Sequence, residues 1–197
     1  MKIIILILII ILFSFLGLFY YQTTDNYQLG ISDQKNVDTI TELESIYKEF
    51  ASIYLDNGQY QKAIDSYKKI LDINSDSSQT WYKLGNTYVS LKNYQKAIAC
   101  YKRVLEINPK DISIFNDLGW VYSVIGDYQK SIEYFKKYSK HKPDDPEIYF
   151  KLGLVYFEAE NIDKAKEKFF IAKNLAKEQG RVKLLKDIEE LLVKIGE

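Results

Sequence analysis

The sequence predicts an all-α fold: an α-solenoid of four helix-turn-helix repeats with a C-terminal capping helix, preceded by one transmembrane helix. Three observations predict it: a pattern that returns every 34 residues, an uncharged N-terminal run of 19 residues, and a composition of 17 Tyr and 10 Phe beside 9 Gly and 3 Pro. Because sandwiches and barrels need many Gly and Pro residues in their turns, this composition favours long helices.

Length and charge limit the classes of function. The 197 residues suffice for one domain with a substantial core. The 27 Lys and Arg residues balance 27 Asp and Glu residues, so the chain lacks the positive field of a general nucleic-acid binder. Cys100 and His141 are the only residues of their kinds, which leaves neither an internal disulfide nor a Cys/His zinc cluster. We therefore expect no nucleic-acid partner and no metal.

Residues 1–21 predict an uncleaved membrane anchor. The run from Ile3 to Tyr21 carries no charge, and at about 1.5 Å per residue it reaches roughly 28 Å, close to the thickness of a bilayer core. A buried core helix would show a polar face, which this run lacks. A cleaved signal peptide is the other alternative, but bulky residues occupy the positions where cleavage needs small ones.

The flanks of this run predict its orientation. Lys2 precedes the run, and Asp25 and Asp33 follow it, so the positive-inside rule keeps the N-terminus in the cytoplasm. The expected localisation is a single-pass membrane protein with its repeats outside the cytoplasm, and the alternative is a repeat domain that faces the cytoplasm. Residues 22–40 show no sustained period and predict a polar tether.

Residues 41–197 predict the repeat domain. Four segments align without a gap at a shift of 34 residues: IYKEFASIYLDNGQYQKAIDSYKKIL, TWYKLGNTYVSLKNYQKAIACYKRVL, IFNDLGWVYSVIGDYQKSIEYFKKYS and IYFKLGLVYFEAENIDKAKEKFFIAK. Thr41 and Glu44 have the spacing of a capping box at the start of the first helix. The units are residues 44–77, 78–111, 112–145 and 146–179.

The residues of the second unit resemble the tetratricopeptide repeat, whose pattern is W-x2-L-G-x2-Y, then A-x3-F, then P. The matching residues are Trp81, Leu84, Gly85, Tyr88, Ala97, Tyr101 and Pro109. This resemblance implies a right-handed solenoid in which the first helices of successive units line a concave groove. In such proteins the groove holds an extended peptide or a partner helix.

The packing of the units can also be predicted from the residue types. Small residues recur where two helices must touch, and Tyr and Phe fill the wider gaps. Asn93, Asp127 and Asn161 lie in the turns, where they can cap the second helices. The small residues are Ala51, Gly85, Gly119 and Gly153 on the first helices, and Ala63, Ala97, Ser131 and Ala165 on the second.

The last unit needs a helix with a polar outer side to close it. Residues 181–196 predict this capping helix, because their apolar residues fall on one stripe. That stripe comprises Val182, Leu185, Ile188, Leu192 and Ile195.

No catalytic motif is present. The sequence lacks a glycine-rich phosphate loop, G-x-S-x-G, H-E-x-x-H and paired cysteines. His141 falls in the link between the third and fourth units, where we expect a solvated loop residue, and Cys100 falls at a position that predicts a tolerant, half-exposed side chain. We therefore expect a protein that is not an enzyme, with no cofactor and no small-molecule substrate.

The resemblance places the ligand-binding groove on specific first-helix positions. Three of its residues, Tyr82, Trp120 and Phe150, are aromatic where other units have polar residues, which favours an exposed interaction surface over core packing. Val89 and Phe157, at other groove positions, are equally consistent with core packing. The predicted site residues are Tyr82, Asn86, Asn116, Trp120, Phe150, Lys151 and Leu154.

The groove positions also exclude one subclass. Repeat proteins that grip the acidic C-terminal tails of chaperones resemble one another in a clamp of Lys, Asn and Arg residues. Here Asp117 or Glu147 falls where the ligand carboxylate would lie, which disfavours such tails. The sequence therefore predicts a membrane-tethered scaffold that binds a protein or peptide partner, in the manner of an envelope assembly or maturation factor. The alternative is a cytoplasm-facing anchored receptor or co-chaperone-like adaptor.

Overall fold

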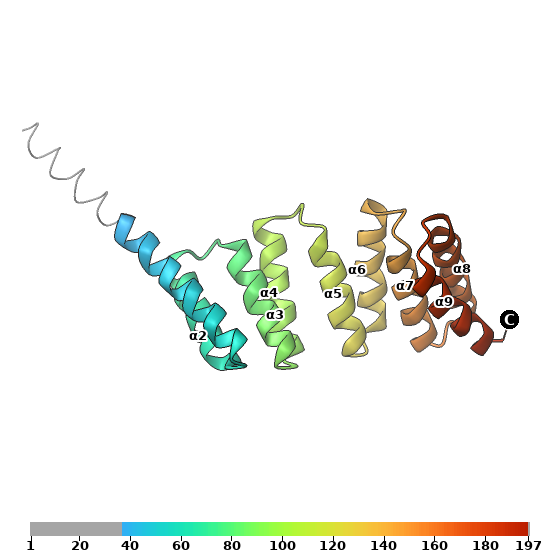
Figure 1. Ribbon diagram of the computed structural model, residues 1–197, viewed down its shortest axis with the longest axis horizontal. Coiled ribbons are helices and arrows are strands. Elements are labelled where there is room, and N and C mark those ends of the chain that lie inside the picture. The colour runs from blue at the N-terminus through green and yellow to red at the C-terminus, as the bar shows by residue number, and fades with distance from the viewer. Residues whose placement is uncertain (1–36, 197) are drawn as a thin grey trace, which may run out of the picture.

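The computed structural model describes residues 37–196, which form nine helices and no strand. An N-terminal helical segment, residues 37–56, comes first. Figure 1 shows the helices arranged as a row of neighbouring pairs along one axis. The other helices are α2 (Tyr60–Ile73), α3 (Ser78–Ser90), α4 (Tyr94–Ile107), α5 (Ser113–Val124), α6 (Tyr128–His141), α7 (Pro146–Glu158), α8 (Ile162–Glu178) and α9 (Val182–Lys194).

The predicted helix-turn-helix units are confirmed. Helices α3 and α4, α5 and α6, and α7 and α8 pack against each other as pairs, and α6 contacts α7 as the next pair begins. The second helices begin at Tyr60, Tyr94, Tyr128 and Ile162. Because these starts share one spacing, the 34-residue pattern of the sequence is the structural period of the fold.

The predicted close approach is confirmed inside the second, third and fourth pairs. A Cβ added to Gly85 would lie 2.6 Å from Cε1 of Tyr101. Gly119 and Gly153 meet the rings of Phe135 and Phe169 in the same way. A larger residue at these glycines would therefore overlap an aromatic ring.

Ser131 occupies a position where the other second helices have alanine. It is fully buried, and its Oγ donates a hydrogen bond to the carbonyl oxygen of Gly119 at 2.7 Å. This bond satisfies the buried hydroxyl, so the third unit tolerates serine at the helix contact.

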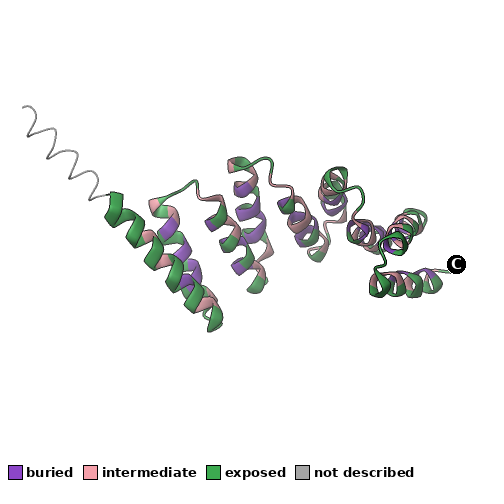
Figure 2. Ribbon diagram, turned by 45° about the horizontal axis from the view of Figure 1, so that its top comes forward, coloured by how far each residue is buried: buried purple, intermediate pink, exposed green. Residues whose placement is uncertain are grey.

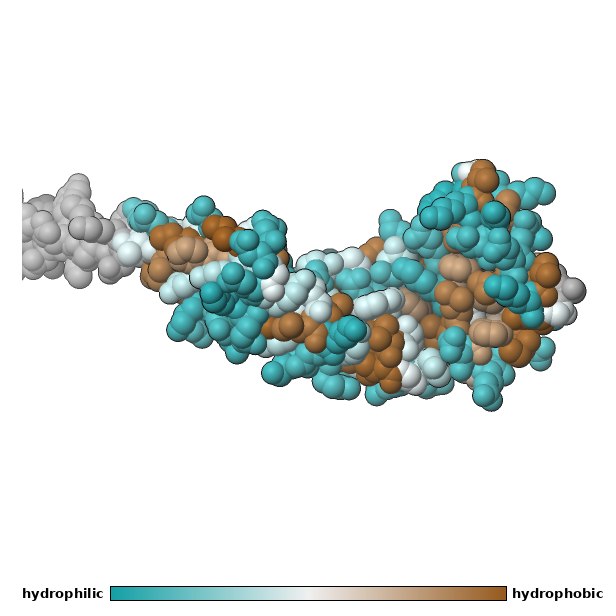
Figure 3. Space-filling model, turned by 60° about the horizontal axis from the view of Figure 1, so that its bottom comes forward, coloured by the Kyte–Doolittle hydropathy of each residue, from teal (hydrophilic) through white to brown (hydrophobic). Residues whose placement is uncertain are grey.

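Stacking between units buries the same three positions of every later first helix. In α5 these are Ile114, Leu118 and Val121, each 0% exposed. The equivalent residues of the 37–56 segment are Ile46, Phe50 and Ile53, which are 41%, 45% and 45% exposed. Figure 2 shows the contrast between the green first segment and the purple faces of the later helices. The first unit thus presents an apolar face that no described residue covers, and Figure 3 shows apolar surface at this end, beside the grey residues.

The turns follow the predicted capping pattern. The side chains of Asn93, Asp127 and Asn161 accept hydrogen bonds from the backbone N–H of Lys96, Lys130 and Lys164. One residue before each cap has a left-handed backbone, with φ of 57° at Lys92, 80° at Gly126 and 58° at Glu160. Two units therefore use a side-chain-bearing residue where the turn geometry favours glycine.

Helix α9 closes the solenoid as predicted. Ile188 and Leu192 are buried against α8, and Lys173 of α8 forms an ion pair of 3.4 Å with Glu189. Val182 differs from the prediction, because it is 76% exposed. Val182 is the first residue of α9, and it lines a pocket beside α7 and is not part of the core.

The beginning of the first helix also differs from the prediction. Residues 37–40, which the sequence assigns to the tether, are helical. The Thr41 hydroxyl donates to the carbonyl oxygens of Val37 at 3.0 Å and Asp38 at 2.8 Å, and Glu44 pairs with Lys48 at 2.6 Å. Thr41 is therefore inside the helix and does not cap it.

The predicted localisation is corrected. Within residues 37–196 no helix is both long and apolar enough to cross a bilayer, because each helix has a polar face as well as an apolar one. The anchor predicted at residues 1–21 lies outside the described residues. The structure therefore gives no support to a single-pass membrane protein with an extracytoplasmic repeat domain.

The left-handed turn positions predict a pair of opposite stability changes. Lys92→Gly should raise the free energy of unfolding by about 0.5–1 kcal/mol, because glycine adopts a positive φ without strain. Gly126→Lys should lower it by a similar amount. Urea unfolding followed by circular dichroism measures both, and shifts of the same sign in the two variants would contradict the turn assignment.

The exposed apolar face of the first unit predicts that the same substitution will change stability differently at two equivalent positions. Leu118→Asp should destabilise the chain by more than about 3 kcal/mol, because it buries a charge between two units. Phe50→Asp, at the equivalent exposed position, should cost less than about 1 kcal/mol. Thermal unfolding of the two variants measures the difference, and equal losses would show that the first face is covered.

Candidate functional site

Two hollows lie on the side formed by the first helices. A pocket of about 210 Å³ between the first two units is lined by Ser52, Leu55, Tyr67, Lys83, Asn86, Thr87 and Ser90. A pocket of about 560 Å³ lies between α7 and the beginning of α9 and includes Phe150 and Lys151. Three of the seven predicted site residues therefore line these pockets. Trp120 and Leu154 line neither of them.

Hydrogen bonds join predicted site residues across neighbouring units. Nζ of Lys151 on α7 donates to Oδ1 of Asn116 on α5 at 2.8 Å. The Asn116 amide donates in turn to Oδ1 of Asp117 at 3.4 Å. In the second unit, the Tyr101 hydroxyl donates to Oδ1 of Asn86 at 2.5 Å. Both asparagine side chains are thus oriented by partners within the protein.

These bonds correct one expectation about the amides. The sequence predicts that Asn86 and Asn116 lie in the groove with both amide groups available to a ligand backbone. In the structure the side-chain carbonyl oxygen of Asn86 accepts a hydrogen bond from Tyr101. Both the side-chain carbonyl oxygen and the side-chain NH2 group of Asn116 have protein partners. Neither asparagine therefore presents a complete free amide to a ligand. In the same region, burial raises the pKa of the Tyr82 hydroxyl, and the neighbouring Asn86 amide offsets part of this rise.

Asp117 is the unusual group of this region. Its Oδ2 is buried and has no hydrogen-bond partner among residues 37–196. Burial raises the pKa of the Asp117 carboxyl above its ordinary value, and the nearby Tyr82 hydroxyl, Asn116 amide and Lys151 ammonium offset this rise only in part. Because native proteins satisfy most buried polar atoms, this oxygen is an exception among the described residues.

Each of the three predicted aromatic residues packs on another ring. Tyr82 packs on Tyr101 with ring centroids 5.9 Å apart, and Phe150 packs on Phe169 at 5.8 Å. Both are half-buried, so each contributes to the core as well as to the surface. Trp120 is 42% exposed and meets Tyr94 edge-on.

A larger hollow, which the sequence does not predict, lies on the side formed by the second helices. This second-helix pocket has a volume of about 700 Å³ between α2, α3 and α4. Cys100 lies at its base and is only 4% exposed, which corrects the expectation of a half-exposed side chain. Burial raises the pKa of the Cys100 thiol to about 11, so the thiol is neutral and apolar in character at neutral pH.

The single histidine does not belong to any site described above. His141 is the last residue of α6, not a loop residue, and its exposed ring stacks on Phe115 at 6.3 Å. Among the described residues no group of three His, Cys, Asp or Glu side chains could hold a metal ion.

Comparisons with known proteins agree with this architecture. Family models of the tetratricopeptide repeat match residues 78–111, 100–133 and 146–169, and a model described as TPR repeat matches residues 51–92. All four are repeat models, and none indicates a catalytic family. A search of curated proteins found no match.

Solved structures with the same fold include several of MamA. A crystal structure of MamA is 26% identical, with a TM-score of 0.64, and the match covers 70% of this chain and 81% of that one. MamA from Desulfovibrio magneticus RS-1, residue 41 to the end, is 21% identical with a TM-score of 0.65, and the match covers 78% of this chain and 93% of that one. The matched residues of this chain are therefore tetratricopeptide repeats, stacked into a solenoid similar to that of MamA.

Proposed function

We propose that this repeat solenoid is a protein-protein interaction scaffold whose concave groove binds a polypeptide segment rich in hydrogen-bond donors. The buried, unpartnered Oδ2 of Asp117 is the observation that carries this proposal. That oxygen is fully buried, so a rotation of the Asp117 side chain would have to expose it before a backbone N–H or a Lys or Arg side chain of a ligand could satisfy it. Binding is the activity that the described side chains of the groove support.

The groove is also arranged to hold its ligand in one register. The Lys151–Asn116 bond connects the third and fourth units and fixes the amide that contacts Asp117. Side chains held by such bonds lose little entropy when a ligand arrives. The exposed ring of Trp120, on the same helix as Asp117, supplies an apolar contact for a neighbouring ligand residue.

Charge around Asp117 selects against acidic ligands. Asp111 adds to the rise of the Asp117 pKa, and Lys151 is the cation that opposes it. A ligand carboxylate placed here would meet a desolvated carboxylate, which costs free energy, whereas a cation would gain a charge-assisted hydrogen bond. We therefore expect basic segments to bind better than acidic ones.

A pH-dependent stability change tests whether the buried, ionised Asp117 carboxylate destabilises the free protein. The pKa of the Asp117 carboxyl is higher in the folded chain than its ordinary value of 3.8, so the folded state binds the proton more tightly than the unfolded state. The free energy of unfolding therefore falls as the pH rises from 3.8 through the pKa of the folded state. Asp117→Asn should therefore raise the melting temperature near about pH 7, and the gain should shrink near about pH 3. Calorimetry at the two pH values measures it. A gain that is the same at both would show that Asp117 does not titrate abnormally.

Peptide selection tests the binding itself. Peptides selected from a random displayed library on the full chain should be enriched in Lys and Arg. Asp117→Asn should weaken their binding by tenfold or more, which corresponds to about 1.4 kcal/mol. Glu133→Gln removes a carboxylate from the exposed side of α6 and is the matched control. Selected peptides that bind Asp117→Asn and the natural chain equally would contradict the proposal.

A further inference from the structure

The second-helix pocket has an apolar base and charged edges. Leu71, Trp81, Leu84, Tyr88 and Cys100 provide the apolar surface. The volume of about 700 Å³ lies within the range of ligand pockets in proteins. Its remaining lining residues are Asp65, Lys68, Lys69, Asp72, Lys96 and Ala99.

The next unit shows what can fill this space. In the third unit the ring of Tyr134 stacks on Tyr122, with centroids 5.5 Å apart and planes at 8°. The same ring lies 6.4 Å from Phe115. Thirty-four residues earlier, the equivalents of Phe115 and Tyr122 are Trp81 and Tyr88.

Cys100 is the equivalent of Tyr134. Its side chain ends where a phenol ring would begin, so the space between Trp81 and Tyr88 is left open. The pocket therefore has the two aromatic walls of the third unit without the ring that joins them there. The first and fourth units have Ser66 and Lys168 at this position, so the ring is a feature of the third unit, where its packing shows that an aromatic ring fits between two such walls.

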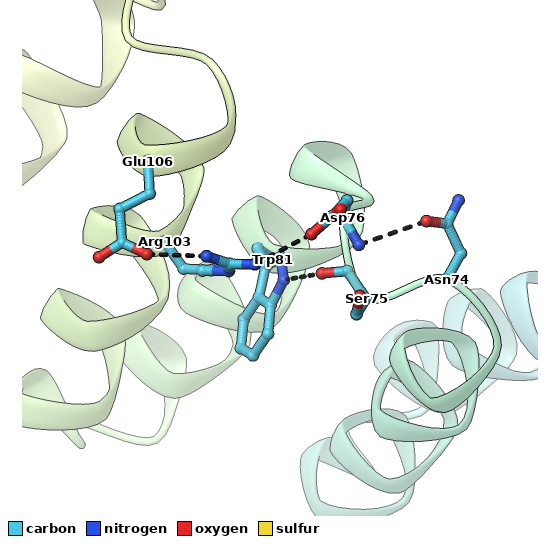
Figure 4. Close-up of polar contacts among 6 residues, drawn as sticks. All are labelled: Asn74, Ser75, Asp76, Trp81, Arg103 and Glu106. Carbon is cyan, nitrogen blue, oxygen red and sulfur yellow. Dashed lines mark hydrogen bonds and ion pairs between the residues drawn. The ribbon is translucent and has the colours of Figure 1, made fainter.

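The walls of the pocket are held in place before any ligand arrives. Nε1 of Trp81 donates to the carbonyl oxygen of Ser75 at 2.8 Å, which orients the indole. Arg103 on α4 pairs with Asp76 and with Glu106, both at 2.9 Å. Figure 4 shows these contacts around Trp81. Such preorganisation reduces the entropy that binding must overcome.

The charges at the edge favour an acidic neighbour for the ring. Nζ of Lys96 lies 5.4 Å from the ring centroid of Tyr88. Lys69 forms an ion pair of 3.8 Å with Asp72, whereas Lys68 has no ion pair among the described residues. Asp65 and Asp72 also line this edge, but the three lysines outnumber them, so a carboxylate beside the incoming ring would meet a net positive edge that includes Lys68 and Lys96.

We propose that the second-helix pocket binds a tyrosine or phenylalanine side chain of a partner protein, presented next to an acidic residue. The ring occupies the place between Trp81 and Tyr88 that Tyr134 fills in the third unit. This site is separate from the proposed binding site at Asp117 on α5, because α2 and α4 contribute most of its lining. The scaffold would then have two binding surfaces of opposite charge preference.

The test uses p-cresol, which reproduces the tyrosine side chain, and saturation-transfer NMR on the full chain. We expect saturable binding to the natural chain and at least a tenfold loss in Cys100→Tyr, whose new ring fills the pocket. The reciprocal variant Tyr134→Cys should gain a second p-cresol site in the third unit. Thermal unfolding of each variant confirms that it is folded, and Tyr134→Cys keeps the test valid if Cys100→Tyr does not fold.

Two short peptides test the ring and its acidic neighbours together. N-acetyl-Glu-Tyr-Glu-amide should bind more tightly than p-cresol, and N-acetyl-Glu-Ala-Glu-amide should not bind. Absence of p-cresol binding, or equal binding by the natural chain and Cys100→Tyr, would overturn the proposal. Light scattering that shows a dimer in the natural chain and a monomer in Cys100→Tyr would assign the pocket to a second copy of this chain, and would overturn it also.

Discussion

The second, third and fourth helix pairs depend on the close approach of a glycine on the first helix to an aromatic ring on the second. Gly85, Gly119 and Gly153 each leave space that a ring occupies. The contact fixes how far the two helices are apart and how they are aligned, and the next unit packs on the surface that results. The geometry of the groove, of the pockets and of the inter-unit hydrogen bonds therefore depends on this repeated contact.

Function in such a fold arises where equivalent positions differ between units. The interior positions are nearly interchangeable, and they explain stability without distinguishing one unit from another. Three differences are informative: Cys100 where the third unit has Tyr134, Asp117 with a buried unpartnered oxygen, and Phe50 on a face that no described residue covers. The first two underlie the two proposed binding sites, through which one chain would hold two partners.

The fold could be predicted from the sequence because the information is periodic. A 34-residue spacing determines which residues face inward, and the caps at Asn93, Asp127 and Asn161 follow from local chemistry. The site was predicted less well, because its bonds join residues of different units. Lys151 and Asn116 are 35 residues apart, and no local pattern indicates that their side chains meet. The helix start near Thr41 was missed because a threonine can bond back inside a helix as well as cap one.

A double-mutant cycle between Gly119 and Phe135 tests the glycine–ring contact most directly. Gly119→Ala alone combines a gain in helix propensity of about 1 kcal/mol with overpacking of about 1–3 kcal/mol against the ring. In the Phe135→Ala background the overlapping ring atoms are removed, and only the gain in helix propensity should remain. The predicted coupling energy is therefore about 1–3 kcal/mol in favour of the double variant, measured by urea unfolding. Additive effects, with a coupling within about 0.5 kcal/mol of zero, would show that this contact does not set the spacing of the helix pair.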